Sequence, residues 1–315
     1  MIHEIETLLK WHGEGHKTIL AIVLSTWGSA PRQAGSMMVI RRDQAFEGSV
    51  SGGCVEGEVI AEAMTMLHFG GAKKLSYGIS NENAWAVGLS CGGQIEILLI
   101  TVEDSQAEHL ETALKKIKNR KTEILEINTR TGEMSAPKIL STELRESPVP
   151  VMMDRLFFLP FRPADELVIV GAVHIAQALA PMAKDLGFDV TVVDPREAFA
   201  QEERFPGINL VTEWPDVYLR ANTPSATTAV VLLTHSPKLD DAGLMVALKS
   251  PAFYIGALGS KNSHAERLER LRETGAEEES LQKIKGPIGL DIKAKTPKEI
   301  AVSILAEIIA EKRAT

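Results

Sequence analysis

Residues 167–194 constrain the fold most, because two short apolar segments flank a glycine turn and a helical pattern. The segments 167–170 and 190–193 are wholly apolar and strand-sized, as in strands buried on both faces of a parallel sheet. Gly171 opens the turn between them, and the second segment ends in Asp194. These are the parts of a dinucleotide-binding βαβ unit. We predict an α/β chain whose C-terminal domain, 163–315, is a Rossmann-like, doubly wound parallel sheet.

The N-terminal part differs, because helical and strand patterns alternate irregularly over 1–147. This mixture favours an α+β domain, which carries the Gly-Gly-Cys motif and includes an edge strand at 122–128. Several prolines lie around the apolar run in 148–162, so we predict a linker there between the two domains.

Composition excludes several classes of protein. The net charge of -8 argues against a nucleic-acid partner, since phosphate binding needs a basic face. The longest apolar runs are strand-sized, which predicts no membrane span. Two cysteines without a secretory signal indicate a cytoplasmic protein with reduced thiols, and they exclude a four-thiolate zinc site.

The stretch 48–58 combines small residues with one of the two cysteines, Cys54. Glycines and serines here allow a tight turn that leaves backbone N–H groups uncovered. A helical pattern follows over 55–68, so Cys54 lies at a helix N-terminus, where the macrodipole favours the thiolate. The other cysteine, Cys91, also adjoins a glycine pair. Both cysteines could instead be small buried apolar residues, the usual role of such a side chain.

The glycine turn departs from the usual dinucleotide fingerprint, because its three positions read Gly171, Val173 and Ala176. A valine at the second position obstructs the approach of a pyrophosphate, which weakens the prediction of NAD binding. Asp194 would favour a ribose hydroxyl over a 2′-phosphate. His174 could contact a phosphate or cap local backbone.

Several motifs together resemble the xanthine dehydrogenase accessory factors, the XdhC/CoxI family. The matching blocks run through nearly the whole chain and lie at 28–32, 48–56, 91–93, 233–235, 254–261 and 287–292. The resemblance implies a helper of molybdenum hydroxylases that works without turning over a metabolite. Such a protein binds the molybdenum cofactor (molybdopterin), holds it while a cysteine desulfurase supplies sulfide, and inserts it into the apo-enzyme. It also implies a homodimer.

The resemblance makes Cys54 the candidate catalytic thiolate and metal ligand, since soft thiolates suit sulfur-bound transition metals. The other candidate cofactor-binding residues are Arg32, Ser51, Gly52, Gly53, Glu56, Cys91, Gly171, His174, Asp194, His235 and Lys261. Amides of Gly52 and Gly53, or of Gly92 and Gly93, could receive the cofactor's phosphate. Arg32 is the nearest motif residue able to pair with that phosphate bidentately.

Each candidate also has a plainer interpretation. Arg32 could end a surface turn, and Glu56 could lie in a first helical turn because acids are favoured there. His235 could stabilise a loop, Lys261 could simply be exposed, and Asp240 could cap a helix over 242–248.

Two other functions compete with the accessory role. One is an NAD(P)-dependent oxidoreductase with a divergent Rossmann site, in which Asp194 selects the cofactor and Cys54 or His235 serves the chemistry. The other is a cofactor-free scaffold that bridges a desulfurase and its client.

Overall fold

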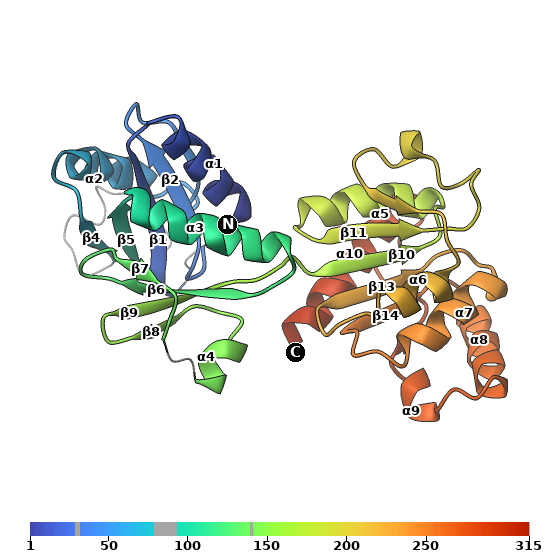
Figure 1. Ribbon diagram of the computed structural model, residues 1–315. Helices are drawn as coiled ribbons and strands as arrows, with labels where there is room; N and C mark the ends of the chain where they lie inside the picture. The colour runs from blue at the N-terminus through green and yellow to red at the C-terminus, as the bar shows by residue number, and fades with distance from the viewer. Residues whose placement is uncertain (29–31, 79–92, 139–140, 315) are drawn as a thin grey trace. The chain divides into compact units, whose positions relative to one another are not determined.

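The computed structural model describes residues 1–28, 32–78, 93–138 and 141–314 (Figure 1). The chain divides into two compact units, Met1–Pro163 and Ala164–Thr315. The first mixes helices with antiparallel sheets and the second is built on a parallel sheet, so the predicted fold class is confirmed. No helix among the described residues is long and apolar enough to cross a membrane.

The first unit is organised around the central strand β1 (Thr18–Trp27), which lies between β2 (Met37–Arg41) and β5 (Gln94–Thr101). The strands β3 (Phe46–Gly48) and β4 (Ala72–Tyr77) complete an antiparallel sheet of order β3-β2-β1-β5-β4. The side chains of β1 alternate between two cores, which is why seven consecutive residues of this strand are buried.

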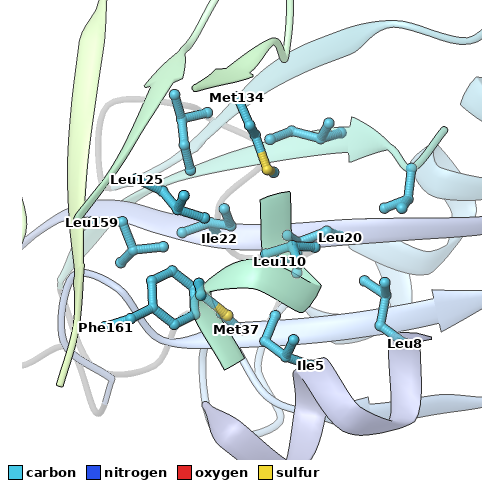
Figure 2. Packing of buried hydrophobic residues seen from close by; sticks show 14 of the residues in the cluster. Ile5, Leu8, Leu20, Ile22, Met37, Leu110, Leu125, Met134, Leu159 and Phe161 are labelled. Atoms are coloured by element: carbon cyan, nitrogen blue, oxygen red, sulfur yellow. The ribbon is translucent and has the colours of Figure 1, made fainter. Parts of the chain in front are cut away.

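One core packs β1 against α1 (Ile2–Gly13) and α3 (Asp104–Lys118), with Leu20 and Ile22 near Ile5, Leu8 and Leu110 (Figure 2). The other core packs Ile19, Ala21 and Val23 against the apolar side of α2 (Glu56–Phe69). The packing of α2 against the sheet therefore fixes the position of its first turn and of the loop before it.

A second, four-stranded sheet has the order β7-β6-β9-β8. Its elements are β6 (Glu123–Asn128), β7 (Met134–Ser135), β8 (Val151–Met153) and β9 (Leu156–Phe161), and a short helix α4 (Thr142–Glu146) precedes β8. The linker predicted at 148–162 is therefore wrong, because β9 buries its apolar side chains against β6 and the unit ends at Pro163. The edge strand predicted at 122–128 is wrong as well, since β6 lies between β7 and β9.

The second unit contains a six-stranded sheet in which every neighbouring pair is parallel, of order β12-β11-β10-β13-β14-β15. The strands are β10 (Glu166–Val170), β11 (Asp189–Val193), β12 (Asn209–Val211), β13 (Thr228–Leu232), β14 (Tyr254–Ala257) and β15 (Ile284–Lys285). From β10 the chain adds β11 and then β12 on one side of the sheet, and from β13 it adds β14 and then β15 on the other. The topological switch point, where ligands of such folds bind, therefore lies between the carboxyl ends of β10 and β13.

Helices cover both faces of this sheet (Figure 1). One face packs against α5 (His174–Asp185) and α10 (Pro297–Ala314). The other packs against α6 (Pro215–Ala221), α7 (Pro237–Ala247) and α8 (Lys261–Glu273). Alternate residues of β10 enter the two cores, with Leu167 and Ile169 on one side and Val168 and Val170 on the other.

Candidate functional site

The loop before α2 closes around the carboxylate of Glu56, which accepts six hydrogen bonds from residues 49–53. Two come from hydroxyl groups, those of Ser49 (2.7 Å) and Ser51. Four come from consecutive backbone N–H groups, those of Val50 (3.2 Å), Ser51 (2.9 Å), Gly52 (3.2 Å) and Gly53 (2.9 Å). Consecutive amides that converge in this way form an anion-binding nest, and here the anion is part of the chain.

Glycine is needed for this geometry at Gly48, Gly52 and Gly53, which all have positive φ values. Gly53 has a φ of 113°, which L side chains rarely adopt. Gly48 has a φ of 84°, and a Cβ there would lie 2.4 Å from the carbonyl oxygen of Met37. The amides of Gly52 and Gly53 donate to Glu56 in this conformation, so a cofactor phosphate would have to displace that carboxylate to reach them.

The nest determines the ionisation of Glu56, which is almost fully buried. Burial alone would raise the pKa of this carboxyl, but hydrogen bonds from Ser51 and Ser49 outweigh it and lower the pKa from 4.5 to about 2. Glu56 is thus a carboxylate at neutral pH, and it binds the loop to the first turn of α2.

A pH dependence follows from this lowered pKa. A carboxyl with a depressed native pKa stabilises the fold above its unfolded pKa of about 4.5, and that contribution disappears as the pH falls to about 2. It amounts to roughly 3 kcal/mol at neutral pH. Denaturant unfolding of the wild type and Glu56→Gln should therefore differ at pH 7 and converge near the native pKa. Two profiles that stay parallel down to that pH would contradict this assignment.

Cys54 lies just before α2, whose first residue is Glu56 rather than the predicted residue 55. Its backbone N–H, like that of Val55, donates to the Ser51 hydroxyl at 2.9 Å. The side chain is half-buried and packs against the core beneath α2. The backbone that carries the thiol is thus fixed by Ser51, which Glu56 fixes in turn.

Arg32 is exposed and lines a pocket of about 280 Å³ in the first unit, together with Gly35, Ser36 and Ser49. The structure thus brings Arg32 towards the serine that donates to Glu56, whereas Cys54 is not among the residues that line this pocket. Ser49 was missed by the sequence reasoning, although it lies within the same small-residue stretch as Ser51. Cys91 lies outside the described residues.

In the second unit, the carboxylate of Asp194 is fully buried and binds the backbone of the glycine turn. It accepts a hydrogen bond from the Ala172 backbone N–H (2.8 Å) and a bidentate pair from the Arg196 guanidinium (2.8 and 2.7 Å). Burial alone would raise the pKa of Asp194, but the bonds from Arg196 and Ala172 lower it. In this conformation both oxygens of Asp194 bind protein groups, and its contact with a ribose hydroxyl stays a prediction. Gly171 has a φ of 108°, and a Cβ there would lie 2.6 Å from the Thr234 methyl carbon.

The other predicted residues of this unit lie where strands end at the carboxyl edge of the sheet. His174 and Lys261 are the exposed first residues of α5 and α8. His235 follows β13, is exposed and has a φ of 57°, which is uncommon for a residue other than glycine. Asp240 lies inside α7 instead of capping it, and accepts hydrogen bonds from the Thr234 hydroxyl (2.6 Å) and backbone N–H (3.3 Å). The carboxylates of Asp194 and Asp240 are thus buried, while three basic or imidazole side chains are exposed.

Comparison with known proteins covers both units. Residues 11–78 match the family model described as "XdhC and CoxI family", and residues 167–308 match the model "XdhC Rossmann domain". The molybdenum cofactor insertion chaperone PaoD of Escherichia coli (strain K12) is 31% identical over 93% of this chain and 83% of that protein. A protein of Bacillus subtilis (strain 168), named as a probable xanthine dehydrogenase subunit, is 28% identical over 94% of both chains. A crystal structure described as a xanthine dehydrogenase from Bacillus halodurans superposes with a TM-score of 0.82, at 25% identity, and covers 99% of this chain and 96% of that one.

Proposed function

Because the chain belongs to the XdhC and CoxI family, we propose that it is a maturation protein that binds the molybdenum cofactor and inserts it into an apo molybdenum hydroxylase. The observation that carries this proposal is the similarity to an insertion chaperone over nearly the whole chain. A cysteine desulfurase would act on the cofactor while this protein holds it. The cofactor is therefore the cargo of the protein.

Cys54 is the proposed ligand for the metal or its sulfur. A thiolate is a soft donor that suits molybdenum bound to sulfur, and the first amides of α2 favour negative charge at this position. Glu56 and Ser51 would act as positioning residues, because they fix the backbone on both sides of the thiol. Since the Glu56 carboxylate fills the nest, the cofactor's phosphate would bind elsewhere, and Arg32 is exposed for such a contact.

At the carboxyl edge of the Rossmann sheet, two features count against the NAD(P) of the alternative function. Val173 follows the turn where a second glycine would admit a pyrophosphate. The Ala172 amide and both oxygens of Asp194 are engaged with each other and with Arg196. His174, His235 and Lys261 are exposed at this edge and would present positive charge or hydrogen-bond donors to an anionic group bound by the second unit.

Transfer to a client tests the function. Protein loaded with sulfurated cofactor, then desalted and mixed with an apo molybdenum hydroxylase, should restore hydroxylase activity in proportion to the loaded protein added. Free cofactor at the same concentration is the control and should restore less, because it is unprotected in solution. Equal activation by both, or none by the loaded protein, would contradict the proposal.

A further inference from the structure

The turn between β14 and α8 has the construction of an anion site. The Ser260 hydroxyl caps the helix, accepting from the Ser263 backbone N–H at 3.1 Å and lying 2.9 Å from the Ser263 hydroxyl. The first-turn amides of Lys261 and Asn262 have no acceptor within the helix. No acidic residue lies in this first turn, and the Lys261 side chain is exposed. A helix N-terminus built in this way attracts anions.

A buried guanidinium beneath the turn is a second, independent sign of a ligand. Arg267, on α8, is 4% exposed, and its Nη2 donates to the Leu258 carbonyl oxygen at 2.7 Å. A Cβ built on Gly259 would lie 3.8 Å from both Nη1 and Nη2, so the group lies directly under the glycine of the turn. Its Nε and Nη1 are buried and have no hydrogen-bond partner among the residues that the structure describes. Buried donors without partners are rare in native proteins and require an explanation.

The nearby acid does not supply the missing partners. The Asp240 Oδ2 lies 3.9 Å from the Arg267 Nη2, beyond hydrogen-bond distance, and it also lacks a partner within the described part of the chain. Burial lowers the pKa of Arg267 and raises that of Asp240, so each charge is poorly compensated. A further anion near the turn would stabilise the guanidinium, because charges interact strongly where water is excluded.

We propose that the β14–α8 turn binds a phosphate monoester. The amides of Lys261 and Asn262 and the Lys261 ammonium would contact the phosphate oxygens, with the Ser260 and Ser263 hydroxyls beside them. The Arg267 guanidinium would supply positive charge from below. This inference rests on the proposed function if the phosphate belongs to the pterin cofactor. A nucleotide is the other kind of molecule that carries such a phosphate group.

The test is a titration of the isotope-labelled full chain with inorganic phosphate, followed by amide NMR shifts at constant ionic strength. The amides of Lys261 and Asn262 should shift and saturate, and Lys261→Ala should weaken the affinity by about tenfold. The matched control is Lys298→Ala, an exposed lysine in the first turn of α10, which should leave the affinity unchanged. Chloride at the same ionic strength should produce no saturating shift.

Adenosine monophosphate and the free molybdenum cofactor then distinguish the two sources. The ligand that shifts the same amides at the lower concentration is the better match. The proposal is overturned if these amides do not respond to phosphate. It is also overturned if Lys261→Ala and Lys298→Ala weaken binding equally. Neither result would alter the retention of the molybdenum cofactor at Cys54. Failure of Cys54 to retain the cofactor would likewise not affect binding of inorganic phosphate at the β14–α8 turn. The two proposals are therefore tested independently.

Discussion

The Glu56→Gln substitution is expected to lower the free energy of unfolding by about 3 kcal/mol at neutral pH. The carboxylate accepts from four consecutive backbone N–H groups and two hydroxyls, and it is nearly fully buried. A glutamine has a single acceptor oxygen, and its NH₂ group would face donors that then have no acceptor. Urea unfolding monitored by circular dichroism measures the change directly.

Glu58→Gln is the matched control, because Glu58 lies in the same first turn of α2 but is exposed. Its substitution removes the same charge near the same helix terminus and should change stability by less than about 0.5 kcal/mol. Equal destabilisation by the two variants would mean that the helix dipole, and not the nest, accounts for the effect of Glu56.

The Cys54→Ser substitution is expected to reduce retention of the molybdenum cofactor by at least about tenfold, because a hydroxyl replaces the soft donor. Stability should change little, since Ser51 binds the backbone of residue 54 and the side chain is only half-buried. The measurement is the fraction of cofactor that remains bound after desalting.

Glu58→Gln is again the control, because it alters an exposed side chain on the same helix and should leave cofactor retention unaltered. If Cys54→Ser retains the cofactor as well as the wild type does, the thiol is not its ligand. If it loses the cofactor together with most of its stability, the loss reflects misfolding, and Cys54→Ala would then be compared at matched folded fraction.

Periodicity predicted the elements that carry the site because each one buries a regular apolar pattern. The strands predicted at 167–170 and 190–193 agree with β10 and β11, each of which begins one residue earlier. The helix after Cys54 was predicted one residue early, since Val55 acts as the cap. The parallel sheet followed from wholly apolar strands separated by helices, as doubly wound folds require.

The sequence patterns were misleading where tertiary contacts determine the role of a residue or a segment. The prolines at 148–162 indicated a linker, yet β9 contains Pro160 and is buried against β6. Asp194 ends the second strand of the βαβ unit, where dinucleotide-binding folds place a ribose contact. In the structure the guanidinium of Arg196, two residues later, donates to both of its oxygens. The partners of this carboxylate follow from distances between side chains, which residue types alone do not give.

Glu56 shows what a sequence pattern leaves undetermined. An acid in a first helical turn is common, and the dipole explains it without reference to any loop. Its role in the nest depends on positive φ values at Gly52 and Gly53, which aim successive amides at one point. The pattern of small residues predicted uncovered amides but could not show that the chain supplies its own anion.

The central claim is that the turn bearing Cys54 holds the molybdenum cofactor. The most direct test is the molybdenum and pterin content of the wild-type protein purified from a host that makes the cofactor. We predict that both are present in equal, near-stoichiometric amounts and that both fall together in Cys54→Ser. Folded wild-type protein without molybdenum or pterin, from a host shown to contain the cofactor, would contradict the account.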